Sequence, residues 1–168
     1  MSPVREARDE DIDAIARVHV DTWRSQYRGI VPDAHLDGLS YDARAKRWRE
    51  ILPTLAANRR HLLVAEEDGA IVGFASGGPE RASGAPFDGE VYAIYVHPDR
   101  QRRGIGRALF DASLRRLRDE GHLRIRVWVL SANPARPFYE KLGGRACGTK
   151  NDTVGGVTLE ETAYAFEP

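Results

Sequence analysis

Arginines and glycines crowd the segment 100–107, which reads R-Q-R-R-G-I-G-R. Glycine lets a backbone turn tightly or approach a ligand closely, and arginine beside it favours a negatively charged ligand. The first amides of a helix have no partner inside the helix, and the helix dipole adds partial positive charge there. A helix that begins near Gly104 would therefore bind a phosphate or pyrophosphate through backbone N–H groups. The residues that would present those amides are Arg102, Arg103, Gly104, Ile105, Gly106 and Arg107.

The glycine spacing alone leaves two interpretations open. The segment has neither the G-x-x-x-x-G-K-[ST] pattern of a Walker A loop nor the G-x-G-x-x-G pattern of a dinucleotide-binding turn. A tight turn with solvated arginines explains the glycines at least as well as an anion site does. The elements around the segment are needed to decide between them.

These flanking elements follow a strand, helix, strand pattern. Apolar positions favour a strand over 90–96, a helix over 104–120 with one apolar face, and a strand over 123–130. That order predicts a right-handed crossover between parallel strands. The full predicted order is β-α-α-β-β-β-α-β-α-β-β. It describes an α/β chain with a mixed sheet and helices on both faces.

The region before this unit predicts two helices and a hairpin. Asp9 and Ser40 are the expected N-caps of the helices, since each precedes a run with helical spacing. Two apolar runs flank Asp68-Gly69, a residue pair favoured in tight hairpin turns.

The composition of the whole chain bounds its class. The 168 residues include 25 Lys and Arg and 25 Asp and Glu, so the formal net charge is zero, and one domain over 1–168 accounts for the length. Zero net charge disfavours a nucleic-acid partner. The chain shows no apolar run near the ~20 residues that span a membrane and no secretory leader, so we expect a cytoplasmic protein. The lone Cys147 is expected to be a small buried residue or a bystander, and the histidine spacing predicts no metal site.

A wider set of motifs resembles one family. Q-x-x-G-x-G at 101–106 follows a strand that ends Y-V-H-P and opens a helix with R-A-L-F. V-A-E-E-D-G-A-I-V-G-F-A-S-G precedes it, and V-W-V-L-S-A-N and A-R-P-F-Y-E-K-L-G follow. Together they resemble the GNAT superfamily of acetyl-CoA-dependent N-acetyltransferases, most strongly over 71–143. The segment 18–39 also resembles a bacterial subgroup that includes polyamine acetyltransferases. The resemblance implies the GNAT fold, a mostly antiparallel sheet with a central pair of parallel strands that splay apart.

The resemblance also implies direct transfer of an acetyl group from acetyl-CoA to an amine. The pyrophosphate of the cosubstrate would sit on the amides of 102–107. Its pantetheine arm would pair with the backbone of Ile94, Tyr95 and Val96, and the Val96 N–H would serve as oxyanion donor. Asn133 would contact the pantetheine region, but N-P-A-R-P-F-Y is one residue shorter here than the N-x-x-A-R-x-F-Y of relatives. Asn133 therefore either keeps that role in a tighter loop or loses it.

Two residues are candidates for proton transfer. Tyr139, in P-F-Y-E-K-L-G, matches the tyrosine that protonates the CoA sulfur in many relatives, and it also suits an aromatic core position. Glu90 begins a predicted strand and, by the period of two, shares a face with Tyr92, Ile94 and Val96. Acids near this position in some relatives take the amine proton, often through water. The alternative is that Glu90 is a charge at a strand edge.

The acceptor side is the least defined part of the predicted site. Trp23, Tyr27, Trp48 and Trp128 are candidates for its wall, and each also suits a core position. We expect a small-molecule amine as acceptor, such as a polyamine, an amino acid or an antibiotic, and a homodimer is compatible with the family. Protein N-termini or lysines as acceptors, or a non-catalytic acyl-CoA sensor, stay open as alternatives.

Overall fold

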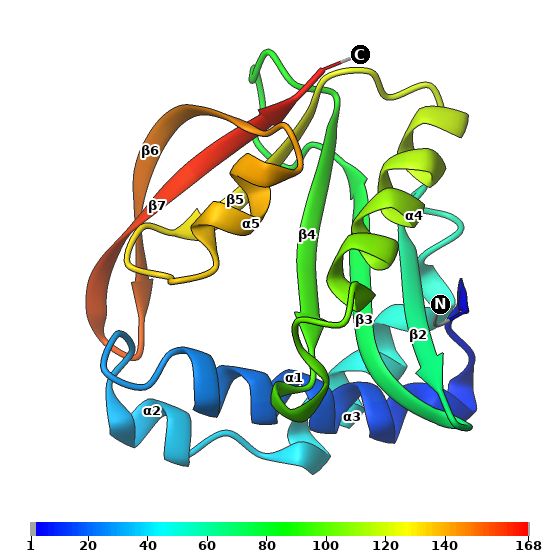
Figure 1. Ribbon diagram of the computed structural model, residues 1–168, viewed down its shortest axis with the longest axis vertical. Helices are drawn as coiled ribbons and strands as arrows, with labels where there is room; N and C mark the ends of the chain where they lie inside the picture. Colours follow the sequence, from blue (N-terminus) through cyan, green and yellow to red (C-terminus); the bar gives the residue numbers. More distant parts are fainter. Residues whose placement is uncertain (1–2, 168) are drawn as a thin grey trace.

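A computed structural model describes residues 3–167 as a seven-stranded mixed sheet with helices on both faces (Figure 1). The strand order is β1-β2-β3-β4-β5-β7-β6, and within these residues only β4 and β5 pair in parallel. The predicted fold class is therefore confirmed. The strands are β1 (Val4–Glu6), β2 (His61–Glu67), β3 (Ala70–Pro79), β4 (Gly89–Val96), β5 (Ile125–Leu130), β6 (Arg145–Val154) and β7 (Val157–Phe166). The helices are α1 (Ile12–Gln26), α2 (Asp33–Asp37), α3 (Tyr41–Ile51), α4 (Ile105–Asp119) and α5 (Arg136–Lys141).

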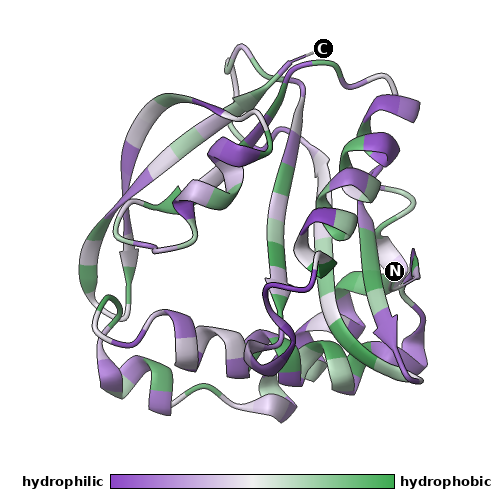
Figure 2. Cartoon of the chain, viewed as in Figure 1, coloured by the Kyte–Doolittle hydropathy of each residue, from purple (hydrophilic) through white to green (hydrophobic). Residues whose placement is uncertain are grey.

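Two helical layers cover the sheet, which explains why β2 is a continuous apolar run. Leu62 and Val64 pack with α1 and α3 on one face, whereas Leu63 and Ala65 pack with α4 on the other. A strand buried on both faces has no polar alternation. In Figure 2, α4 is banded in hydrophobic and hydrophilic colours, as a helix with one buried face should be. No helix within residues 3–167 is both long enough and apolar enough to cross a membrane.

The parallel strands β4 and β5 stay together for only three residue pairs. Gly89, Glu90 and Val91 pair with Ile125, Arg126 and Val127, and no further pair follows. Beyond Val91 the two strands diverge, and Figure 1 shows α1 and α2 beyond their open end. The predicted splay is therefore present, and it opens toward the end of β4 that leads into α4.

A β-bulge interrupts β4 at Tyr92. The pairing with β3 passes from Ser76↔Ala93 to Gly77↔Val91, so Tyr92 has no partner. The extra residue reverses the alternation of side chains. Val91 and Ile94 consequently pack in the same apolar cluster. The prediction that Glu90 shares a face with Ile94 and Val96 is wrong, because the period of two holds only in an unbroken strand.

The helix starts are partly as predicted. Ser40 caps α3, since its Oγ accepts a hydrogen bond from the Ala43 amide at 3.2 Å. Asp9, in contrast, is the first residue of a short 3-10 turn and not a cap. Asp11 takes the capping role instead: its carboxylate accepts from the Arg8 amide at 2.8 Å and from the Arg5 guanidinium at 2.7 Å. The Arg8 amide and the Arg5 guanidinium, both of which precede the acidic run, thus fix Asp11 and not Asp9 in this role.

Candidate active site

An open cavity of about 1220 Å³ lies where β4 and β5 separate. It exceeds the ~300–1,000 Å³ typical of a pocket for one small ligand. Segments from α1 to β7 contribute to its wall. Most of the predicted site residues line it, namely Trp23, Tyr27, Glu90, Ile94, Tyr95, Val96, Arg102, Gly104, Gly106, Arg107, Trp128, Asn133 and Tyr139.

Two residues of the predicted anion site do not line the cavity with their side chains. Ile105 is 3% exposed and packs in the apolar cluster between α4 and the sheet. Arg103 extends toward Glu67, with 3.6 Å between the guanidinium and the carboxylate. Only the backbone of these two residues can serve the predicted anion site. The prediction for them rested on their amides, and it stays a prediction.

The first turn of α4 presents free backbone donors to one end of the cavity. The first intrahelical hydrogen bond runs from the Ala108 amide to the Gly104 carbonyl at 3.0 Å, so the amides of 105–107 have no acceptor inside the helix. Gly104 has a φ of 82° and Arg102 a φ of 62°, which bend the chain sharply into the helix. Arg102 and Arg107, which flank this turn, both line the cavity. Free amides, the helix dipole and cations together suit a phosphate-rich ligand.

The exposed edge of β4 supplies a second set of backbone donors. The His97 amide donates to the Val72 carbonyl of β3 at 2.8 Å. Successive amides of a strand point to opposite edges, so the Val96 and Ile94 amides point toward the edge that β5 has left. The Val96 carbonyl already accepts hydrogen bonds from Thr22 at 3.3 Å and Gln101 at 3.1 Å. Its amide is thus placed in a rigid strand end at the cavity.

Tyr139 reaches the cavity from α5. Its ring stacks on Tyr164, with 5.9 Å between the ring centroids, and meets Phe138 edge-on at 5.1 Å. Burial raises the pKa of the Tyr139 hydroxyl well above its ordinary value. The hydroxyl is consequently protonated at neutral pH and can act as a proton donor.

Asn133 is tied into the protein by its carbonyl oxygen. Its Oδ1 accepts hydrogen bonds from the Ala135 amide at 2.8 Å and from the Gln26 side chain of α1 at 2.9 Å. These bonds form the tight turn into α5 and join it to α1. The residue still lines the cavity, so its Nδ2 is the group that can meet a ligand.

The aromatic residues divide between the cavity wall and the core. Trp23 meets Tyr27 edge-on at 4.8 Å, and both line the cavity. Trp128 lies between two cations, with Arg126 at 4.7 Å and Lys150 at 4.4 Å from its ring centroid. Trp48 instead packs in the apolar cluster of α1 and α3. Of the two positions considered for Trp48, the structure shows the core position; the sequence does not show which way the α3 side chain points.

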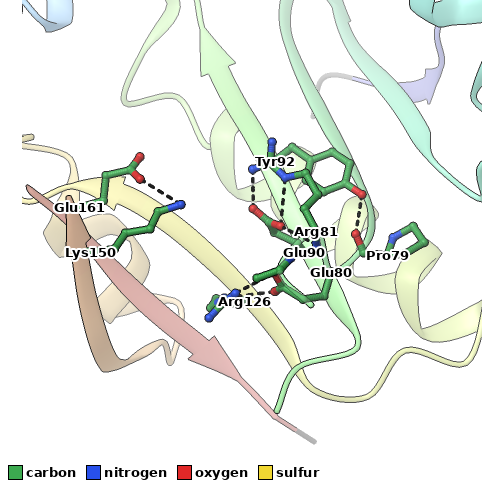
Figure 3. Close-up of polar contacts among 9 residues, drawn as sticks. Pro79, Glu80, Arg81, Glu90, Tyr92, Arg126, Lys150 and Glu161 are labelled. Carbon is green, nitrogen blue, oxygen red and sulfur yellow. Dashed lines mark hydrogen bonds and ion pairs between the residues drawn. The ribbon is translucent and has the colours of Figure 1, made fainter. Parts of the chain in front are cut away.

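Three ion pairs near the acceptor end were not foreseen (Figure 3). Arg126 of β5 donates two hydrogen bonds to Glu80 at 3.1 and 2.7 Å. Arg81 donates to Glu90, and Lys150 of β6 lies 3.3 Å from Glu161 of β7. The members of each pair are distant in sequence or lie in an irregular loop. The charged residues were visible in the sequence, but their partners depend on strand order.

Glu90 is buried at 1% exposure, and Arg81 engages both of its carboxylate oxygens. The Arg81 Nε lies 3.1 Å from one oxygen and Nη2 lies 2.5 Å from the other. The residue lines the cavity, but the Arg81 guanidinium already donates a hydrogen bond to each of its two carboxylate oxygens. The role of Glu90 as a base stays a prediction, and the geometry gives its oxygens another partner.

Cys147 is an exposed free thiol on the edge strand β6, so of the two expected alternatives the buried residue is wrong and the bystander stays a prediction. Its Sγ lies 3.6 Å from the Ala163 carbonyl, and partial burial raises the thiol pKa. It is not among the residues that line the cavity. Across residues 3–167, no group of three or more His, Cys, Asp or Glu side chains is arranged to hold a metal ion.

Comparison with known proteins shows the family to which the chain belongs. The model of the acetyltransferase (GNAT) family matches residues 13–144. The chain belongs to this family. It is an N-acetyltransferase of the GNAT type with acetyl-CoA as cosubstrate. The free amides at the foot of α4, the cations around them and the open edge of β4 suit that cosubstrate.

Individual relatives support the assignment. The N-acetyltransferase YuaI of Bacillus subtilis is 38% identical over 99% of this chain and 93% of its own length. The L-amino acid N-acyltransferase MnaT of Escherichia coli is 37% identical over 49% of this GNAT chain and 48% of its own. The crystal structure of ribosomal-protein-alanine N-acetyltransferase from Brucella melitensis has a TM-score of 0.80 at 21% identity and covers 99% of both chains. The acetyl-CoA complex of yncA from Salmonella typhimurium has a TM-score of 0.73 at 25% identity and covers 98% of this chain and 92% of its own.

Proposed function

We propose that this GNAT enzyme acetylates the primary amine of a small molecule. The observation that carries the proposal is the continuity of the cavity from the phosphate-binding end at α4 to a walled acceptor end. Trp23, Tyr27 and Trp128 line that acceptor end together with Val154 of the β6–β7 hairpin. Such a concave, partly aromatic wall suits a compact acceptor. The E. coli relative is named an L-amino acid N-acyltransferase, which supports a small acceptor with a primary amine.

The residues of this chain would divide the work as follows. The amides of 105–107 bind the phosphates, and the β4 edge orients the thioester. The Val96 N–H donates to the carbonyl oxygen as negative charge develops there. The amine first loses a proton to water in the open cavity, because an ammonium ion has no lone pair to attack with. The new C–N bond forms as the C–S bond breaks. Tyr139 gives its proton to the departing sulfur. The proton released by the new amide nitrogen returns to Tyr139 through solvent.

A panel of acceptors tests this proposal. We expect the enzyme to release CoA thiol from acetyl-CoA with at least one class of small primary amine and to release none without an amine. Lysine-containing peptides and peptides with free N-termini serve as the comparison. Turnover with peptides alone would favour a protein acetyltransferase. Tight CoA binding without turnover on any acceptor would favour a sensor.

A further inference from the structure

Two ion pairs at the acceptor end share one arrangement, in which the cation is the exposed partner. The Arg81 side chain is 54% exposed and the Glu90 side chain behind it 2%. The Lys150 side chain is 45% exposed and the Glu161 side chain 17%. Both cations line the cavity, and Figure 3 shows Lys150 pointing from β6 toward the Arg81–Glu90 pair. At these two pairs the cation is the partner nearer the cavity and the carboxylate lies behind it, while Asp152, an exposed carboxylate of β6, also lines the cavity.

Arg81 is held in place more firmly than an exposed arginine usually is. Its Nε and Nη2 bind the two oxygens of Glu90, its backbone amide donates to the same carboxylate at 3.3 Å, and its guanidinium lies 4.5 Å from the Tyr92 ring centroid. Tyr92 is itself fixed, because its hydroxyl donates to the Pro79 carbonyl at 2.6 Å. Within the described part of the chain, Arg81 Nη1 makes no hydrogen bond.

The loop that carries Arg81 is anchored at its start. Glu80, the preceding residue, accepts two hydrogen bonds from Arg126, and both side chains are nearly buried at 5% and 10% exposure. In the register of the parallel strands, Arg126 of β5 lies opposite Glu90 of β4. Contacts hold the Arg81 side chain, and the Glu80–Arg126 pair holds the loop that carries it. Arg81 therefore loses little conformational entropy when it binds an anion. Its planar guanidinium has the geometry that suits a carboxylate.

We propose that the acceptor is a primary amine that also carries a carboxylate, as an amino acid does, and that Arg81 binds this carboxylate. The inference rests on the proposed function and narrows its acceptor class. A polyamine would bring only positive charge toward Arg81 and Lys150, and like charges repel at close range. A zwitterion brings the matching negative group. Glu90 then is a positioning residue that holds Arg81, which accounts for a fully buried carboxylate at the cavity wall.

Matched acceptors test the inference. Initial rates would be measured for the standard L-amino acids other than Pro, Asp and Glu and, for each, the amide and the decarboxylated amine, which keep the primary amine but lose the carboxylate. We expect kcat/KM of the wild type to be highest for an amino acid. Arg81→Gln should lower that kcat/KM by about 10- to 100-fold, mainly through KM, because one charge-assisted contact is lost. It should leave the KM for acetyl-CoA unchanged, and it should not lower the rates with the decarboxylated amine, because that amine has no carboxylate for Arg81 to bind. Arg47→Gln, at an exposed arginine of α3 outside the cavity, is the matched control and should change nothing.

Glu90→Gln separates positioning from base catalysis. As a positioning residue, Glu90 affects the KM for amino acids, and the pH dependence of kcat stays as in the wild type. As a base, its removal lowers kcat for every amine and changes the pH profile. The latter result would overturn the positioning role.

The outcomes distinguish the two levels of proposal. Equal kcat/KM for amino acids and their decarboxylated amines, or an equal loss for both in Arg81→Gln, would overturn the carboxylate inference and leave the acetyltransferase function intact. Turnover restricted to amines without a carboxylate would do the same. Absence of turnover with every small amine would overturn the proposed function itself, and this inference with it.

Discussion

Tyr139 carries its proton at neutral pH, because burial raises the pKa of its hydroxyl, so the proton is available to the sulfur as the C–S bond breaks. We predict that Tyr139→Phe lowers kcat by about 10²-fold or more, as expected for loss of a general acid. The dissociation constant of CoA should stay the same, since the ring and its packing are kept. Steady-state rates and calorimetric CoA titration measure the two quantities. Tyr41→Phe, which removes a hydroxyl bonded to Asp21 outside the cavity, should keep full activity. An unchanged kcat in Tyr139→Phe would reject Tyr139 as the acid.

His61 makes stability depend on pH. It is buried, its Nε2 lies 2.6 Å from the Ser113 Oγ, and desolvation lowers its pKa from 6.5 to about 4. In the unfolded chain, the His61 side chain is protonated below about pH 6.5. In the folded chain, it is protonated only below about pH 4. The free energy of unfolding should therefore fall as pH drops through this interval, by roughly 3 kcal/mol from His61. Buried His19, whose pKa is lowered to about 3, acts in the same direction.

Urea unfolding at several pH values measures this effect. The loss of stability between about pH 7.5 and pH 5 should be smaller in His61→Gln than in the wild type. The Arg5–Asp11 pair contributes in a separate window, since the Asp11 pKa is lowered from 3.8 and its stabilisation is lost only at more acid pH. Equal pH dependence in wild type and variant would contradict the account of His61.

At the scale of elements, the foot of α4 depends on one left-handed residue. Gly104 has a φ of 82°, and a β-carbon there would meet nothing within 4 Å. Gly104→Ala should therefore cost about 1 kcal/mol of stability through backbone conformation alone. It should also weaken CoA binding, because the amides that follow must shift. Equilibrium unfolding and CoA titration test both effects.

Gly121, just beyond the other end of α4, is a matched control. It also has a positive φ, of 91°, and a β-carbon added there would likewise meet nothing within 4 Å. Gly121→Ala should lose about the same stability and keep the CoA affinity of the wild type. If Gly104→Ala binds CoA as the wild type does, the phosphate-binding role of this turn is refuted.

Local signals predicted most single elements, whereas contacts between elements escaped prediction. The amphipathic pattern of 104–120 matches α4 (Ile105–Asp119), and the Ser40 cap is present. The bulge at Tyr92 has no local signal, because it exists only relative to the register of β3. Because of the bulge, Ile94 and Val96 do not lie on the same face of β4 as Glu90. Burial of Trp48 likewise depends on the docking of α3 against α1.

At the scale of the whole molecule, the order of the strands in the sheet creates the cavity. The parallel pairing of β4 and β5 stops after Val91, and residues from α1 to β7 line the opening. Most of the residues that the resemblance assigned to the donor side line the cavity, and they carry recognisable motifs; their role in binding the donor stays a prediction. The ion pairs at the acceptor end join the 80–81 loop to β4 and β5 and join β6 to β7, so no single stretch of sequence encodes them.

Transfer of a labelled acetyl group tests the central claim most directly. The enzyme would be incubated with acetyl-CoA carrying carbon-13 in its acetyl group, together with each small amine, and thiol release and N-acetylated product would be followed in the same sample. The account predicts that one labelled N-acetyl amine appears for each thiol released, and that neither appears when the amine is omitted. Binding of CoA without labelled product from any small amine would contradict it.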